Sequence, residues 1–467
     1  MKKDNLKKWI GRIVIFGGFF ILRNFIPEGL DQKGWDGFLV LFLTVLLWIT
    51  EAVPMGVTAV FALFFAGFIG FETQENILKG FSGTGVFFLL SAMTIGQIFT
   101  NVGLGKRLSL YILPMLGKKA KNVLLSVMLG TGIISMFLAD IPTALIFYGI
   151  TMPILAENGL KPGESNYGKA MMLGIPIAAA FGGIGTPAGS GMNAVTMSLF
   201  KNLTGLDISF TAWSLVGAPI ALVSIFFSWL ILCLVYKPEI EVVKGLENAQ
   251  KNREEIGPLS SKEKKFGIIF LIMIFFWFFP DLVGINMYIT SWFGVFIMAL
   301  PGMDLFDWET TVKKIDWNAF LICFTATALA TVVSNLGTGE WLSGILTDLF
   351  LGDVANKGLF LLVLIINFMM MIGHYPMPQG LSLVGLLLPV VVALSDSLGI
   401  NPLALGLPVA MSTSMLLLVP IDPTCFTTYS GGYWKIKDMM FIGVLVTTVY
   451  VFINTFWVVI VENLGMI

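Results

Sequence analysis

The sequence carries the hexapeptide TNVGLG at residues 100–105 and a close echo of it, SNLGTG, at residues 334–339. The two copies lie 234 residues apart in a chain of 467 residues. An echo at a spacing of about half the chain indicates that the protein consists of two related halves.

The same offset relates the places where long apolar segments are interrupted. Proline, glycine and polar residues break the apolar segments 122–157, 168–200, 358–395 and 403–432. Such residues end or kink helices, so each segment is expected to contain a break. The offset maps Asp140 onto His374, Pro142 onto Pro376, and residues 185–187 (GTP) onto residues 419–421 (VPI).

The composition places these segments in a membrane. Hydrophobic residues make up 56% of the chain and charged residues only 12%, whereas a soluble domain carries roughly 25% charged residues. Apolar runs of roughly 17 to 25 residues, the length that crosses a bilayer, recur from end to end. We therefore expect an all-α polytopic membrane protein in the plasma or inner membrane. The net charge of −1 gives no argument for nucleic acid, and we expect no such partner.

Lysine and arginine orient the helices, because short loops rich in both face the cytoplasm. Residues 105–121 carry five basic residues and no acidic one, and residues 237–265 carry seven basic residues. Both loops fall inside if the N-terminus is cytoplasmic and segments 122–157 and 358–395 are re-entrant hairpins. The prediction is about 11 transmembrane helices and two re-entrant helical hairpins, in two repeats of opposite orientation.

The domain organisation is expected to follow this repeat. Each repeat contains one hairpin and one broken helix, and the mixed charges between the repeats favour a flexible, solvated linker. The predicted segments are N-terminal scaffold helices at 1–78, a first inverted repeat at 79–236, a cytoplasmic linker at 237–265, connecting scaffold helices at 266–312, and a second inverted repeat at 313–467.

Inverted repeats with broken helices at matching positions are typical of secondary active transporters whose binding site lies near the bilayer midplane. Non-helical backbone is tolerated at membrane depth only where protein or a watery cavity satisfies its hydrogen bonds. Free helix N-termini at such breaks attract an anion, and unpaired carbonyls can coordinate a cation. The broken segments therefore predict one site for a small anion together with a cation.

Three further motifs resemble those of one family of carriers. They are WITEAVP at residues 48–54, GGIGTP at residues 182–187 followed by Asn193, and GGYWKI at residues 431–436 followed by Asp438. Over nearly its whole length the chain resembles the divalent anion/sodium symporter family, which carries dicarboxylates, citrate and sulfate. The resemblance implies a homodimer with a fixed scaffold domain and a mobile transport domain that slides as an elevator. It also implies that sodium and substrate lie between the hairpin tips and the unwound segments.

The hairpin tips depart from the family's pattern, so we expect an atypical member. The family has Ser-Asn-Thr at each tip, whereas this chain has residues 139–141 (ADI) and 373–375 (GHY). A carboxylate at membrane depth costs at least about 2.5 to 3.5 kcal/mol unless it is paired or hydrated, so Asp140 is predicted to bind a cation or a proton. Its structural alternative is a helix cap.

His374, the only histidine, occupies the equivalent tip. It is predicted to exchange a proton or to bind a carboxylate, and its structural alternative is a satisfied core residue. We hypothesise that Asp140 and His374 meet as a charge-bearing pair.

The other candidates lie in the same four segments. Asp422 precedes Pro423 and is either a cation ligand or a helix cap. The predicted ion-binding or coupling residues are Asp140, Gly185, His374, Pro420 and Asp422, with sodium expected at Asp140, Gly185 and Asp422. The predicted substrate-binding residues are Thr143, Thr186, Asn193, His374, Gln379, Thr424 and Thr427.

The resulting prediction is a secondary active transporter rather than an enzyme. It carries a small anion such as a di- or tricarboxylate, is driven by sodium or protons, and needs no cofactor beyond that ion. Two alternatives stay open, a cation/proton antiporter, which Asp140 and Asp422 would suit, and an anion exchanger. A single histidine without catalytic spacing argues against a membrane-embedded enzyme. Arg23 and Glu51 are interpreted as structural residues near helix ends.

Overall fold

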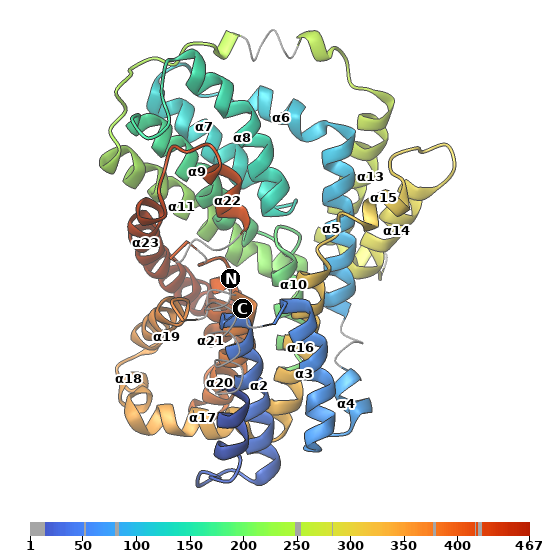
Figure 1. Cartoon of the computed structure of the whole chain (residues 1–467), viewed down its shortest axis with the longest axis vertical. Coiled ribbons are helices and arrows are strands. Elements are labelled where there is room, and N and C mark those ends of the chain that lie inside the picture. Colours follow the sequence, from blue (N-terminus) through green and yellow to red (C-terminus); the bar gives the residue numbers. More distant parts are fainter. Residues whose placement is uncertain are drawn as a thin grey trace, which may run out of the picture.

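A computed structural model describes residues 15–50, 53–79, 84–247, 254–282, 284–376, 380–415, 417–418 and 423–467. Helices make up the molecule from end to end (Figure 1). Within these residues the β-structure is limited to an isolated bridge between Lys119 and Val242. The predicted all-α class is therefore confirmed.

The helices follow the predicted order along the chain. The first half contains α2 (Gln32–Thr50), α3 (Met55–Ile69), α4 (Gln74–Lys79), α5 (Thr84–Val102), α6 (Leu104–Ile112), α7 (Ala120–Ser135), α8 (Asp140–Glu157), α9 (Asn166–Gly183), α10 (Gly191–Thr204) and α11 (Phe210–Val235). The second half contains α13 (Ser261–Phe278), η2 (Pro280–Leu282), α14 (Met287–Ala299), α15 (Trp308–Val312), α16 (Trp317–Asn335), α17 (Thr338–Leu346), η3 (Thr347–Leu351), α18 (Gly352–Ala355), α19 (Leu359–Gly373), α20 (Gly380–Leu398), α21 (Pro402–Met411), η4 (Ser412–Ser414), α22 (Pro423–Tyr429) and α23 (Ile436–Asn463).

The helices suit a lipid environment in length and in surface. Among the described helices, α2, α5, α11, α16 and α23 are long and apolar enough to cross a bilayer, and several shorter ones are apolar throughout. Large apolar side chains also face outward, such as Phe68 at 79% exposure and Leu271 at 66%. A soluble protein rarely exposes so much apolar surface, whereas lipid accommodates it. The number of crossings stays a prediction.

The hexapeptide echo forms the same structure twice. In each copy a long helix ends, a glycine in the left-handed region follows, and a helix of nine residues begins: α5, Gly103 and α6 in the first half, α16, Gly337 and α17 in the second. The φ angles of 83° and 78° at these glycines strain any residue with a Cβ, which explains why glycine recurs. The basic segment 105–121, expected to be a loop, thus contains α6.

The four interrupted segments form two helical hairpins and two broken helices. The helix pair α7 and α8 lies in the upper part of Figure 1, and α19 and α20 lie in the lower part. The broken helices are α9 with α10, and α21 with η4 and α22. Because α9 contacts α22 while α10 contacts α21, the two broken helices lie side by side in opposite directions. This arrangement is the one expected of inverted repeats.

Two glycines pack the unwound segments against the helices that follow them. A Cβ on Gly217 of α11 would overlap the carbonyl oxygen of Ile184, and a Cβ on Gly443 of α23 would overlap that of Leu417. The helices α11 and α23 also contact each other. Each unwound segment is therefore held against its neighbour by a close backbone approach that only glycine permits.

The first part of the predicted linker, residues 238–247, is largely exposed as expected, but hydrogen bonds fix it to the first hairpin. The backbone N–H of Ala120 donates to Glu241 O and that of Val243 donates to Lys118 O, both at 2.9 Å. Asn158 at the end of α8 exchanges hydrogen bonds with the backbone of Lys244 at 2.9 and 2.8 Å. The linker also ends earlier than residue 265, because α13 begins at Ser261. Residues 238–247 thus form a strap across the open end of the first hairpin.

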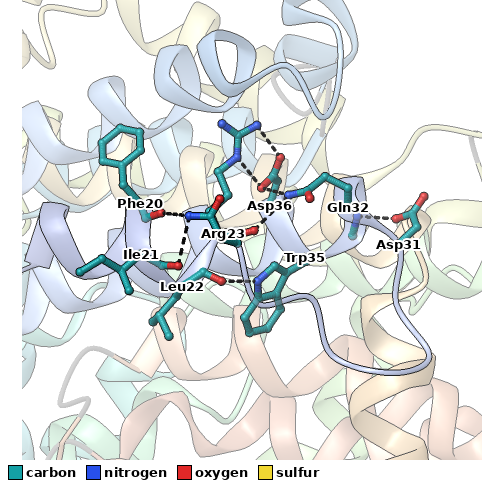
Figure 2. Close-up of polar contacts among 10 residues, drawn as sticks. Phe20, Ile21, Leu22, Arg23, Asp31, Gln32, Trp35 and Asp36 are labelled. Carbon is teal, nitrogen blue, oxygen red and sulfur yellow. Dashed lines mark hydrogen bonds and ion pairs between the residues drawn. The ribbon is translucent and has the colours of Figure 1, made fainter.

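Arg23 has the structural role that its position indicated. Figure 2 shows its guanidinium against the carboxylate of Asp36, with nitrogen to oxygen distances of 2.9 and 3.0 Å. The Gln32 amide donates to the same carboxylate at 2.8 Å. Asp36 is buried, so this paired geometry keeps its charge satisfied. Glu51 lies outside the described residues.

Candidate functional site

The first hairpin tip brings Asp140 to the first unwound segment. Residues 136–139 form the tip, and α8 begins at Asp140, which lies in the first turn of the helix. Ser135 Oγ lies 2.7 Å from Asp140 Oδ1 and 2.9 Å from Ala179 O. A Cβ on Gly183 would overlap the same carboxylate, so Asp140 lies directly against the end of α9. Asp140 also lies in the first turn of α8, so its position agrees with the helix-start alternative as well as with a role at the site.

Residues 184–190 form the first unwound segment, which is tied to the hairpin tip by side chains that the sequence singled out. The Thr186 hydroxyl donates to Met136 O at the tip. Asn193 Nδ2 donates to Gly183 O at 2.7 Å and to Thr186 O at 2.8 Å, bridging both sides of the break. Asn193 is fully buried, and its Oδ1 has no hydrogen-bond partner among the described residues. Thr143 of α8 instead donates to the carbonyl oxygen of Ala139, the residue that precedes the helix.

Oxygen atoms converge where this segment passes the tip. A Cβ on Gly189 would lie 2.5 Å from Gly183 O, 2.7 Å from Ser135 O and 2.9 Å from Met136 O. The backbone N–H of Gly185 donates to Gly182 O at 2.8 Å, which keeps the turn compact. Hard cations prefer oxygen ligands, and carbonyls of unwound helices supply them in transporters. The carbonyl oxygens and the Asp140 carboxylate are ligands of the kind that a sodium ion binds.

The second hairpin tip carries His374 at the end of α19. Its Nδ1 lies 2.8 Å from Met370 O, and the side chain is 1% exposed. Its Nε2 has no hydrogen-bond partner in the part of the chain that the structure describes. The hypothesis that His374 pairs with Asp140 is not supported, because no hydrogen bond or ion pair joins these two described residues.

The second unwound segment begins at η4, beside the same tip. A Cβ on Gly380, the first residue of α20, would overlap the carbonyl of Thr413. The Thr413 hydroxyl is fully buried and lacks a partner among the described residues. Further along, Thr427 donates to Thr424 O at 2.6 Å within α22. The predicted residues Gln379, Pro420 and Asp422 lie outside the described residues.

The two tips differ in charge at helix N-termini. The first turn of α8 contains the acid Asp140, whereas the first turn of α20 contains no acid. A helix N-terminus carries a partial positive charge that favours an anion. The first tip therefore suits a cation, because Asp140 already offsets that charge. The second tip suits an anion.

Several residues at the site were missed by sequence reasoning. Ser135 had no visible signal, because one serine in an apolar run is ordinary. Thr413 could have been found, since Ser412, Thr413 and Ser414 form a run of three hydroxyls within an apolar segment. Thr428, which donates to Met172 O of α9 at 2.7 Å and joins the two broken helices, had no distinguishing pattern.

Solved structures share the fold. The YdaH transporter of Alcanivorax borkumensis is 11% identical with a TM-score of 0.54, and covers 83% of this chain and 88% of its own. MtrF of Neisseria gonorrhoeae, described as illuminating a class of antimetabolite efflux pumps, is 12% identical with a TM-score of 0.56 and 82% of each chain covered. At these identities the likeness concerns the fold alone.

Proteins found by sequence comparison are more similar in sequence than these solved structures. A sodium-dependent dicarboxylate transporter, SdcS, of Staphylococcus saprophyticus is 25% identical over 472 residues, covering 95% of this chain and 90% of its own. The SdcS protein of Staphylococcus aureus is 24% identical over 450 residues, covering 90% and 85%. The family described as the sodium:sulfate symporter transmembrane region matches residues 3–466. The chain is therefore an integral membrane transporter that belongs to the sodium:sulfate symporter family, the divalent anion/sodium symporters that its motifs resemble.

Proposed function

We propose that this protein is a sodium-coupled symporter of a small dicarboxylate. The observation that carries the proposal is the convergence of three carbonyl oxygens at Gly189, beside the partly buried carboxylate of Asp140. Relatives named as sodium-dependent dicarboxylate transporters support both the ion and the substrate class.

The cation is assigned to the first tip. Asp140 supplies a full negative charge, and the carbonyls of Ser135, Met136 and Gly183 supply partial ones. Ser135 and Thr186 act as positioning residues, because their hydroxyls hold Asp140 and the tip backbone. Binding sodium there would offset the cost of a carboxylate at membrane depth and would stiffen the unwound segment, which prepares the neighbouring anion site.

The anion is assigned to the second tip. The N-terminus of α20 favours negative charge, and Thr413 and His374 each have a buried polar atom that lacks a partner among the described residues. A bound carboxylate would accept a hydrogen bond from the Thr413 hydroxyl, which offsets the desolvation of that group. Asn193 contributes from the first repeat, because α10 contacts α20 and α21.

We further propose an elevator mechanism and a homodimer, as the family resemblance implies. The hairpins and broken helices would move as one body, because α11 contacts α23 and the strap at residues 238–247 holds the first hairpin. Crosslinking paired cysteines on a hairpin and on α2 or α3 should trap one conformation and stop transport. The mass of the purified protein in detergent should correspond to two chains.

The test of the proposed function is uptake of labelled succinate into proteoliposomes. A sodium gradient and a pH gradient are imposed separately, without substrate inside, and unlabelled sulfate is added as a competitor. We expect accumulation that requires sodium. Uptake only when substrate is loaded inside would identify an exchanger. Sodium or proton flux without succinate uptake would identify the cation/proton antiporter, and either result would overturn the proposal.

A further inference from the structure

His374 has a defined tautomer, because its Nδ1 faces the carbonyl oxygen of Met370. The carbonyl oxygen of Met370 can only accept a hydrogen bond, so Nδ1 at 2.8 Å must carry the proton that it donates. A neutral imidazole has one N–H and one lone pair. The Nε2 atom of neutral His374 is therefore an acceptor.

This lone pair is buried without a donor. His374 is 1% exposed, and none of the described residues offers Nε2 a hydrogen bond. Such an atom costs free energy unless a ligand or proton satisfies it. It lies at the hairpin tip where the proposed function assigns the substrate anion.

No charged group of the described residues compensates a charge on this ring. The elements in contact with α19 include α18, α21, η4 and α23, and Gly373 of α19 also approaches Leu383 of α20. Asp438 pairs with Lys169, Glu462 accepts from Asn401, and the Tyr450 hydroxyl donates to Met411 O. No hydrogen bond or ion pair joins His374 to any titratable residue of these elements within the described ranges, namely Asp353, Asp396, Lys437, Asp438, Tyr450 and Glu462.

A carboxylate oxygen is also an acceptor, so it cannot approach a neutral Nε2 without a proton between them. We propose that one substrate carboxyl binds His374 through a single shared proton, so that the protein takes up a dicarboxylate in its singly protonated form. The proton arrives either on the substrate or on the ring. Both routes give the same complex: one dicarboxylate, one proton and one imidazole, with a net charge of −1. This inference rests on the proposed function and adds the protonation state of the substrate to it.

The inference predicts how transport depends on pH. Above the second pKa of succinate, each pH unit lowers the singly protonated fraction by about tenfold. The KM for total succinate should therefore rise by up to about tenfold per pH unit at saturating sodium. The maximal rate at saturating substrate should change little.

Two variants isolate His374 in the same proteoliposomes. In His374→Gln the side-chain amide nitrogen takes the place of Nε2 and donates without an added proton, so the KM should become nearly independent of pH. In His374→Asn the amide keeps the bond to Met370 O but does not reach the Nε2 position, so the KM should rise at every pH. Sodium-dependent thermal stabilisation in detergent reports whether each variant is folded.

The outcomes separate this inference from the function on which it rests. A wild-type protein without sodium-driven uptake at any pH would remove the proposed function. Sodium-driven uptake with a KM that does not vary with pH would overturn only the inference. A pH-dependent KM that persists in a folded His374→Gln variant would also overturn it, because another group would then hold the proton.

Discussion

At the first hairpin tip, hydrogen bonds join the side chains to the tip backbone and to the unwound segment. At the second tip, buried polar atoms have no hydrogen-bond partner among the described residues. At the first tip, Ser135 holds Asp140 and Thr186 holds the tip backbone. At the second, His374 Nε2 and Thr413 Oγ1 lack partners among the described residues. An unsatisfied buried polar atom costs about 1–3 kcal/mol, so the second tip is the half that gains most from a ligand.

This difference shows how two copies of one structural unit can come to bind different ligands. The duplicated backbone supplies a hairpin and a broken helix in each half. Side chains at equivalent positions, Asp140 and His374, then give one half a carboxylate and the other an imidazole. The difference between the two halves depends on a few side chains, so substitutions in the two halves should have unequal effects on ion binding and stability.

The largest effect is expected for Asp140→Asn. The change removes the only full charge assigned to the sodium site, and sodium affinity should fall by about 10- to 100-fold. Sodium dependence of succinate uptake in proteoliposomes measures this. Asp396→Asn, an exposed acid near the end of α20, is the matched control and should behave as wild type. Unchanged sodium dependence in Asp140→Asn would remove the assignment of the cation to the first half.

Gly189→Ala tests the carbonyl cluster itself. The added Cβ would lie 2.5–2.9 Å from three carbonyl oxygens, so the tip must shift, at a cost of about 1–3 kcal/mol. Stabilisation of the detergent-solubilised protein by sodium should be strongly reduced. Gly149→Ala in α8, where a Cβ meets no atom within 4 Å, is the control. Equal stabilisation of both variants by sodium would contradict the cluster's role.

The repeat-equivalent residues Asn193 and Thr427 compare the two halves directly. Asn193→Ala leaves two buried carbonyls, Gly183 O and Thr186 O, without their donor, and each loss costs about 1–3 kcal/mol. Thr427→Val removes one bond within α22, worth about 0.5–1.5 kcal/mol. Thermal unfolding in detergent should therefore show the larger loss for Asn193→Ala. The reverse order would mean that the second unwound segment is the more tightly held.

The smallest effect concerns the short helices that follow the hexapeptides. Arg107 of α6 donates to Glu263 at 2.7 and 3.1 Å, whereas the equivalent Trp341 of α17 donates to Glu28 O at 3.0 Å. Glu263 precedes the apolar part of α13, and the Arg107 guanidinium holds its pKa below the ordinary value of 4.5. A carboxylate with a lowered pKa stabilises the fold above that ordinary value, and the stabilisation is lost as the pH falls through the lower folded-state pKa.

Only the first half should therefore have, after its hexapeptide, an ion pair whose contribution to stability is lost at low pH. The melting temperature of wild type should fall more between pH 7 and pH 3 than that of Glu263→Gln, whose side chain does not titrate. Trp341→Phe should lower the melting temperature by a similar amount at both pH values. A Glu263→Gln variant as acid-sensitive as wild type would show that other groups dominate.

Much of the fold was predictable because its signals are local. Proline lacks a backbone N–H and glycine allows positive φ, so residues such as Gly103 and Gly337 mark breaks without reference to distant contacts. The offset of 234 residues located both hairpin tips, and with them Asp140 and His374. The attachment of the strap at residues 238–247 was not predicted, because its hydrogen bonds involve residues of the first hairpin more than 80 positions away.

The sequence by itself determined the all-helical membrane class, the duplication and the residues at the two tips, since composition and helix-breaking residues act within a few positions of themselves. Only the tertiary structure decided what those residues touch. It brought Thr186 to Met136, placed Ser135 against Asp140, and joined His374 to Met370. The physical reason is that hydrogen bonds act over about 3 Å, and the packing of whole helices decides which groups come that close.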